Sequence, residues 1–276
     1  MRLSVRHTTR YRFDEPARGV VQSLRLWPCD CASQKVLRWD VVTDGALRGA
    51  EFTDGAGDRT ALASWRGPVE TATIVVTGEV ETTDLFGVLR DHREKGPASL
   101  YLRATRHTEA DQDLRELSAS TLDGMKKASE LDRAHALAAA IADAIEYAPG
   151  ETRAHTTGAE ALAGGKGVCQ DHTHALIAVS HVAGIPARYV TGYLQAGEAG
   201  GPHEASHAWA ELFVPELGWV GFDAANRCCP DERYIRLGSG YDAQDAAPIR
   251  GLVQGNSPAE HLEVEVEVIA EQQQQQ

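Results

Sequence analysis

One cysteine in this sequence stands where the chain could turn it into a nucleophile. The loop Gly165-Lys166-Gly167-Val168 leads into Cys169, and an apolar run at 175–179 continues to Gly184-Ile185-Pro186, which is a helix stop. We therefore expect Cys169 at the N-terminus of a helix, where unpaired backbone N–H groups and the helix dipole favour an anion such as a thiolate. A free cysteine is also often a small buried hydrophobe, and this stretch alone leaves both interpretations open.

A histidine and an aspartate follow at positions that suit a base and the carboxylate that orients it. His207 begins a strand-like run at 207–214, a turn is expected at 215–218, and Asp223 ends the next run. Two adjacent antiparallel strands would bring His207 beside Asp223, and a helix packed across that edge would bring the thiol to the imidazole. At this point, an exposed strand position for His207 and a turn or cap role for Asp223 are the alternatives.

Such a constellation would perform acyl transfer. Cys169 would attack a carbonyl, His207 would take the thiol proton and later protonate the leaving group, and Asp223 would fix the tautomer of the imidazole. The backbone N–H of Cys169 is a natural oxyanion donor, and the sequence names no second one. Cys169 is the only cysteine with both a predicted helix N-terminus and a candidate base, so we expect it to be the reactive thiol.

The composition narrows the class of partner. The chain has 276 residues and a net charge of −13, and it holds no run of Lys or Arg, which argues against a nucleic acid or an anionic membrane as partner. We see neither a secretory signal nor an apolar segment near the ~20 residues of a membrane span, so we expect a cytoplasmic protein. The spacings of Cys29 with Cys31 and of Cys228 with Cys229 do not match zinc motifs, so no metal and no cofactor are expected.

Hydrophobic patterning divides the chain near residue 105. Alternating or β-branched runs, separated by turns, predict a β-rich N-terminal domain at 1–105. These runs are 3–13, 20–27, 36–42 and 71–80. We expect them to form an antiparallel sheet or sandwich.

The second part of the chain alternates between helical and strand patterns. Helices are expected at 114–122, at 131–145 before Pro149-Gly150, and from Cys169, and strands at 188–194, 207–214, 219–223 and 262–268. We therefore predict an α+β fold, with a catalytic domain at 106–270 in which helices pack on an antiparallel sheet. The glutamine tail at 271–276 has nothing to bury and is expected to be disordered.

Four blocks of this region together resemble the bacterial transglutaminase-like family. They occur in the family's order and are Gly167-Val168-Cys169-Gln170-Asp171, 184–193, Ser206-His207-Ala208-Trp209 and 218–223. The N-terminal region and the C-terminal blocks resemble the segments that accompany this domain in bacteria, so the resemblance covers nearly the whole chain. It implies a papain-like packing of a helix against an antiparallel sheet, and a catalytic triad at Cys169, His207 and Asp223.

Two blocks depart from the family pattern. Asp223 is followed by Ala224-Ala225-Asn226, where the family usually has Pro-Thr-Asn, and the lost proline could loosen the placement of Asp223. Gly238-Ser239-Gly240-Tyr241 replaces a Gly-Arg-Asp-Tyr block, so substrate preference could differ if this segment lines the cleft. We expect His172 near the cleft, one turn from Cys169, and His174 in a structural role.

We therefore predict a cysteine peptidase or amidase that hydrolyses a peptide or amide substrate through a thioester. Transamidation of protein-bound glutamine is the alternative, but the short segment 195–202 has no aromatic insertion to wall a dry amine site, which favours hydrolysis. A binding module that has lost catalysis is a further alternative, and the presence of all three triad residues argues against it.

A zinc peptidase is the remaining alternative. His203-Glu204-Ala205-Ser206-His207 matches the H-E-x-x-H pattern, in which two histidines on one helical face hold zinc and the glutamate acts as base. Gly200-Gly201-Pro202 precedes the match and a strand-like run follows it. The helix that this pattern requires is therefore not expected.

Overall fold

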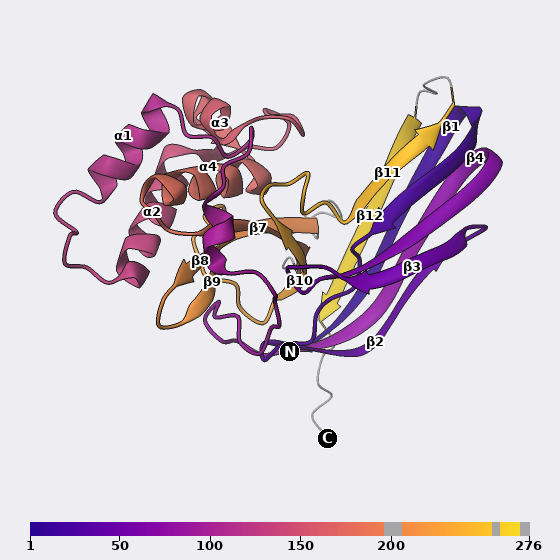
Figure 1. Ribbon diagram of the computed structural model, residues 1–276, viewed down its shortest axis with the longest axis horizontal. Coiled ribbons are helices and arrows are strands. Elements are labelled where there is room, and N and C mark those ends of the chain that lie inside the picture. Colours follow the sequence, from indigo (N-terminus) through magenta and orange to yellow (C-terminus); the bar gives the residue numbers. More distant parts are fainter. Residues whose placement is uncertain (196–205, 256–259, 271–276) are drawn as a thin grey trace.

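The computed structural model describes residues 1–195, 206–255 and 260–270. It has two lobes, one of long strands and one of helices around a short sheet (Figure 1). The fold is α+β, as the sequence patterns predict, with an antiparallel N-terminal sheet followed by helices that pack on a second antiparallel sheet. Among the described helices, none combines the length and the apolar character that a membrane crossing requires.

The first lobe is a six-stranded sheet built on two very long strands, β1 (Arg2–Leu24) and β4 (Arg59–Thr82), which pair antiparallel. The strands β2 (Gln34–Thr43) and β3 (Leu47–Thr53) both pair with β4. The two runs predicted at 3–13 and 20–27 form the single strand β1. A register shift between Arg12 and Ala17 absorbs Pro16, because proline is tolerated at a bulge.

The C-terminal strands return to this first sheet. The strands β11 (Ile249–Gln254) and β12 (Glu260–Ala270) pair antiparallel with β1. The sequence pattern predicts one of these strands, at 262–268, within the segment 106–270, and in the structure both pair with β1 of the N-terminal sheet. The reason is that strand pairing is set by non-local contacts, to which the alternation within a strand gives no guide. The division at residue 105 stays a prediction, and the tail at 271–276 lies outside the described residues.

The second lobe packs helices around a four-stranded antiparallel sheet in the order β10-β7-β8-β9. Its strands are β7 (Ala187–Leu194), β8 (Ser206–Val214), β9 (Gly218–Phe222) and β10 (Tyr234–Gly240), and its helices are α1 (Gln112–Thr121), α2 (Glu130–Ala144), α3 (Gly158–Gly164) and α4 (Cys169–Val182). Two short strands, β5 (Glu146–Tyr147) and β6 (Lys166–Gly167), pair in parallel, and a 3₁₀ turn, η1 (Ala98–Leu102), links the lobes. The helices at 114–122 and 131–145 thus form as predicted.

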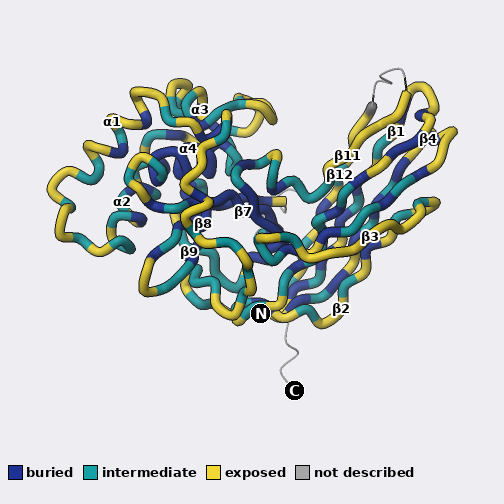
Figure 2. Tube along the Cα trace, viewed as in Figure 1, coloured by how far each residue is buried: buried dark blue, intermediate teal, exposed yellow. Residues whose placement is uncertain are grey.

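Helix α4 is the centre of the second lobe. Every residue from Asp171 to Ser180 is buried. The other three helices cover α4 on one side and β7 and β8 cover it on the other, so it has no exposed face along these turns (Figure 2). Leu176 and Val179 join Ala210 and Leu212 of β8 in one apolar core. A helix enclosed in this way holds its first residue in a fixed position.

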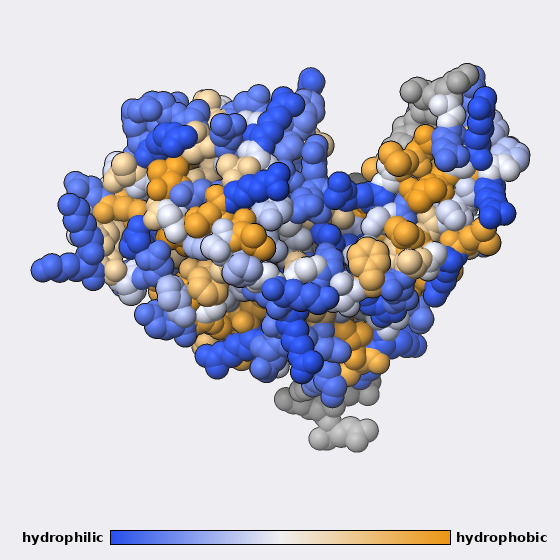
Figure 3. Space-filling view, viewed as in Figure 1, coloured by the Kyte–Doolittle hydropathy of each residue, from blue (hydrophilic) through white to orange (hydrophobic). Residues whose placement is uncertain are grey.

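The two lobes share a core. Leu3 and Val80 of the first sheet pack in one apolar cluster with Tyr193, Ile235 and Leu237 of the second. Apolar colour also gathers on the visible surface of the long-stranded lobe (Figure 3), where β3 and β11 carry several exposed apolar side chains. The shared cluster, rather than that outer surface, joins the N-terminal sheet to the strands that carry the candidate site.

Candidate active site

Helix α4 begins at Cys169, as predicted. The carboxylate of Asp171 accepts hydrogen bonds from the backbone N–H of Val168 (2.8 Å) and from the hydroxyl of Thr152 (2.6 Å), which fixes the turn that leads into the helix. A side chain at Gly167 would place its Cβ 2.7 Å from the Cβ of Asp171, so this position requires glycine. The backbone N–H of Cys169 lies in the first helical turn, where the helix has no carbonyl to accept it.

The base and its carboxylate meet at the edge between β8 and β9. His207 lies at the start of β8, and Asp223 immediately follows β9, its antiparallel neighbour. The Nε2 of His207 lies 2.6 Å from Oδ2 of Asp223, and both residues are buried. The structure therefore places these two residues as the strand pattern predicts.

The thiol completes this series. Cys169 also neighbours His207 and acts on the pKa of its imidazole. Burial by itself lowers the pKa of His207, but the hydrogen bonds to Asp223 and Cys169, with the charges of both groups, raise that pKa to about 10. The imidazole is therefore protonated at neutral pH. The structure brings together Cys169, His207 and Asp223, while their catalytic roles stay predictions.

The aspartate is held by two further side chains. The hydroxyl of Tyr234 and the side-chain amide of Asn226 each donate to Oδ2 of Asp223 at 2.8 Å, and the backbone N–H of Asn226 donates to Oδ1 at 3.0 Å. Burial by itself raises the pKa of Asp223, but the hydrogen bond and charge of His207, with the two hydrogen bonds from Asn226, outweigh it and lower that pKa. The backbone of Asp223 also pairs in both directions with Cys228. The turn is thus fixed without the family's proline.

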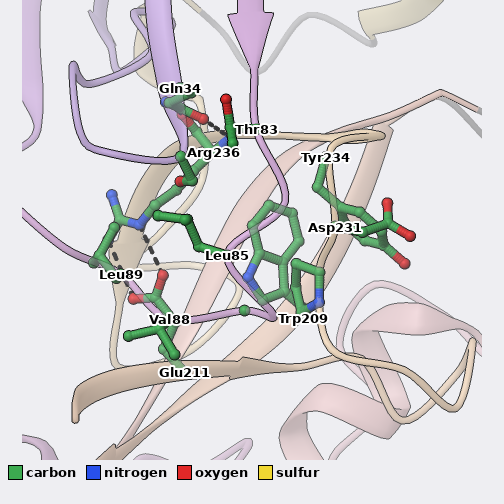
Figure 4. Close-up of a pocket in the computed structure, with 13 residues that line it drawn as sticks. Gln34, Thr83, Leu85, Val88, Leu89, Trp209, Glu211, Asp231, Tyr234 and Arg236 are labelled. Atoms are coloured by element: carbon green, nitrogen blue, oxygen red, sulfur yellow. Dashed lines mark hydrogen bonds and ion pairs between the residues drawn. The ribbon is translucent and has the colours of Figure 1, made fainter. Parts of the chain in front are cut away.

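Tyr234 is the residue that the sequence analysis missed. It lies on β10, and its ring contacts the ring of Trp209 at 5.5 Å, while Trp209 stacks on His207 at 6.5 Å between ring centroids. Figure 4 shows Trp209 and Tyr234 side by side on the wall of a small cavity. The cavity has a volume of about 40 Å³, and neither Cys169 nor His207 lines it. No spacing in the sequence links Tyr234 to Asp223, so only the fold could reveal this contact.

A buried charge network supports the strands of the site. Glu211, four residues after His207 on β8, accepts hydrogen bonds from Arg188 of β7 (2.7 Å) and Arg236 of β10 (2.9 Å). The guanidinium of Arg236 also donates to Asp58 of the first lobe at 2.9 Å. Burial raises the pKa of Glu211, but the two arginine charges outweigh it and lower that pKa. Because removing one member leaves a buried charge unpaired, this network resists rearrangement of β7, β8 and β10.

The other histidines singled out by the sequence lie apart from this series. His172 is buried, with its ring nitrogens at 2.9 Å from the carbonyl oxygens of Val168 and Ile145, so it ties the start of α4 to the end of α2. His174 is fully buried, stacks on His107 and accepts from the backbone N–H of Ala243. His174 thus has the structural environment we expect.

The residues of the zinc pattern are only partly described. His203 and Glu204 lie outside the described residues, and His207 lies in a strand with its Nε2 on Asp223. Across the three described ranges, no group of three or more His, Cys, Asp or Glu side chains is placed to hold a metal ion. The Gly238-Ser239-Gly240-Tyr241 block lies at the lobe interface, where Ser239 bonds to Asp58.

Comparison with known proteins identifies the family. Residues 117–224 match the transglutaminase-like superfamily, and residues 3–81 match the bacterial transglutaminase-like N-terminal region. The chain belongs to the transglutaminase-like superfamily and carries that N-terminal region. Both matches agree with the resemblance seen in the sequence blocks.

Individual relatives give the extent of this similarity. An uncharacterized protein of Mycobacterium leprae is 31% identical over 280 residues, which cover 97% of this chain and 98% of that protein. A crystal structure from Cytophaga hutchinsonii, described as a candidate cysteine protease, matches with a TM-score of 0.72 and 22% identity over 96% of this chain and 90% of that one. A protein-glutamine gamma-glutamyltransferase of Pseudomonas aeruginosa is 40% identical over 72 residues, or 24% of this chain and 11% of that protein.

Proposed function

We propose that this protein is a cysteine-dependent acyl-transfer enzyme that hydrolyses an amide or peptide bond through a thioester. The observation that carries the proposal is the placement of Cys169, at the first turn of a buried helix, beside His207, whose imidazole bonds to Asp223. Membership of the transglutaminase-like superfamily supports it. The same proposal includes a cytoplasmic location. It also includes a peptide or amide as the substrate, rather than a nucleic acid or a membrane as the partner.

The first half of the reaction uses His207 as an acid. Its raised pKa favours the imidazole as the group that takes the thiol proton when the sulfur attacks. The sulfur attacks the substrate carbonyl, and the backbone N–H of Cys169 donates to the developing oxyanion. The C–N bond then breaks, the leaving amine takes the proton from His207, and a thioester remains on Cys169.

The second half uses His207 as a base. Acylation removes the hydrogen bond and the charge by which Cys169 helps to raise the pKa of His207, so that pKa falls once the thioester forms. The neutral imidazole then takes a proton from water, which attacks the thioester and releases the acid. Asp223 keeps the ring oriented through both halves.

Transamidation is the second candidate, because an amine can resolve the same thioester. The short similarity to the Pseudomonas aeruginosa protein-glutamine gamma-glutamyltransferase favours keeping it under test. Water is far more abundant than any amine, so transamidation requires a site that excludes water and holds the amine. We propose hydrolysis as the main outcome.

The test is mass spectrometry of the products from a glutamine-containing peptide incubated with the enzyme and excess primary amine. We expect mostly the free acid or cleaved peptide, and loss of both in the Cys169→Ala variant. The control variant Cys31→Ser, which removes a thiol in the loop between β1 and β2, should retain the activity. A predominance of amine adduct would assign the protein as a crosslinking enzyme instead.

A further inference from the structure

A second cavity, with a volume of about 190 Å³, adjoins the aspartate of the candidate site. Helix α2 contributes Ala138 and Ala139 to its wall, and the end of β9 with the turn after it contributes Phe222, Asp223 and Ala224. We call this space the Phe222 cavity. It shares Asp223 with the candidate active site, because the carboxylate of that residue bonds to the imidazole beside the thiol.

Three polar side chains in the wall of the Phe222 cavity already have partners within the protein. Asp223 accepts hydrogen bonds from Tyr234 and Asn226. The guanidinium of Arg227 donates to a carboxylate and a carbonyl in the last turn of α2, at 2.5 and 2.6 Å, and the sulfur of Cys228 lies 3.3 Å from the hydroxyl of Tyr234. Groups that are already paired gain little from a polar ligand, whereas the alanine methyl groups and the phenyl ring gain when water leaves. The wall therefore favours an apolar occupant.

The size and the position of the Phe222 cavity suit a single side chain. An apolar cavity of about 150 Å³ can hold a benzene molecule, so this space is large enough for the side chain of leucine, methionine or phenylalanine. Its wall runs from the exposed residues His135 and Ala139 to the buried residues Phe222 and Ala224. The rings of His135 and Phe222 meet edge to face, with 5.0 Å between their centroids. One end of the cavity therefore faces solvent, and the other end lies against the core.

We propose that the Phe222 cavity is the subsite for a large apolar side chain of the peptide substrate, on a residue that flanks the bond attacked by Cys169. This inference rests on the proposed function. Neither Cys169 nor His207 lines the cavity, so it does not hold the reacting carbonyl. An extended peptide advances about 3.3–3.6 Å per residue. A residue one or two positions from the scissile amide can therefore reach past His207 and Asp223 into this space.

The first test measures binding in the full chain with Cys169→Ala, so that it requires no turnover. N-acetylphenylalanine amide and N-acetylglycine amide are added separately, and NMR follows the ring protons of His135. We expect a saturable shift with the phenylalanine derivative, and binding of the glycine derivative that is at least ten-fold weaker.

A matched pair of variants locates the bound side chain. Ala139→Trp fills the Phe222 cavity from an exposed helical position and should abolish the saturable shift. Ala140→Trp makes the same change at the next residue of α2, which does not line the cavity, and should retain the shift. Circular dichroism checks that both variants fold.

The second test measures specificity in the active enzyme. Peptides that carry glycine, leucine or phenylalanine at the positions flanking the reactive residue compete in one pool, and mass spectrometry follows their consumption. Leucine or phenylalanine at one flanking position should raise kcat/KM at least ten-fold over glycine. Ala139→Trp should bring this ratio close to one, and Ala140→Trp should preserve it.

The outcomes separate the subsite from the proposed function. Equal binding of the two derivatives, a shift that persists in Ala139→Trp, or turnover with no apolar preference would overturn the subsite and leave the hydrolase assignment intact. Saturable binding without turnover of any peptide would contradict hydrolysis, but not recognition of the apolar side chain. The comparison of the two derivatives needs no change in the cavity, so it decides the matter even if Ala139→Trp folds poorly.

Discussion

The regions around Cys169 and Cys31 show how neighbouring groups set the chemistry of a thiol. Cys169 faces a histidine that a buried aspartate orients, and the histidine can take a proton and return it. Cys31 lies in the loop between β1 and β2, with its sulfur 3.3 Å from the hydroxyl of Ser33. A histidine that a carboxylate orients suits repeated proton transfer, which a serine hydroxyl does not provide. The side chain beside each sulfur, rather than the sulfur itself, therefore distinguishes the two regions.

The largest expected effect separates the two thiols in catalysis. Cys169→Ala should reduce hydrolysis of an amide substrate to the uncatalysed rate, because no other group can form the thioester. Cys31→Ser should leave kcat/KM unchanged under reducing conditions. Both rates are to be measured with the same peptide, with circular dichroism to check folding. If Cys31→Ser abolished hydrolysis and Cys169→Ala left kcat/KM unchanged, Cys169 would not be the catalytic thiol.

The next effect concerns the carboxylate that distinguishes the Cys169 region. Asp223→Asn keeps the shape but can present an amide donor to His207, which favours the wrong tautomer. The equivalent change in a serine protease costs about 10⁴ in turnover, and we expect a smaller loss here because a thiol ionises more readily than a hydroxyl. Turnover that matches the wild type would remove Asp223 from the mechanism.

The pH dependence should follow the protonation of His207. The protonated ring donates to the leaving amine, so kcat/KM should fall as pH rises through about 10, the raised pKa of His207. Asp223→Asn removes a cause of that rise, so the alkaline limb should move to lower pH. A pH–rate profile of both proteins measures the shift, and an unmoved limb would show that Asp223 does not set the protonation of His207.

A smaller effect is expected at Tyr234. Tyr234→Phe removes one hydrogen bond to Asp223, worth about 1 kcal/mol, which corresponds to a roughly five-fold loss of kcat. KM should change little, because Tyr234 acts through Asp223. Tyr11→Phe, in the long-stranded lobe, is the matched control. An equal rise in KM with kcat preserved would place Tyr234 in substrate binding instead.

The smallest effect tests the Cys31 region. Cys29 is the largest cause that lowers the pKa of Cys31, so Cys29→Ala should slow the alkylation of Cys31 by iodoacetamide at pH 7 a few-fold. The alkylation rate of Cys169 should not change. Peptide mapping reports both rates from one sample, and a uniform change at both cysteines would indicate a general loss of structure.

Local patterns in the sequence predict the elements that carry the site, but not the contacts that support it. The helix at Cys169 and the strands that carry His207 and Asp223 follow from periodicity and turn residues within short windows. The return of β12 to β1, and the contact of Tyr234 with Asp223, depend on which distant segments pack together. The charge network around Glu211 is not predictable from the sequence for a further reason: charged residues on strands usually face water.

The central claim is that Cys169 carries the acyl group. It is tested by acid-quenching the enzyme during turnover of an activated amide or ester and mapping the peptides by mass spectrometry. The account predicts the acyl mass on the peptide that contains Cys169, its loss on longer incubation in water, and its absence in Cys169→Ala. Turnover with an acyl group on another residue, or undiminished turnover in Cys169→Ala, would contradict the account.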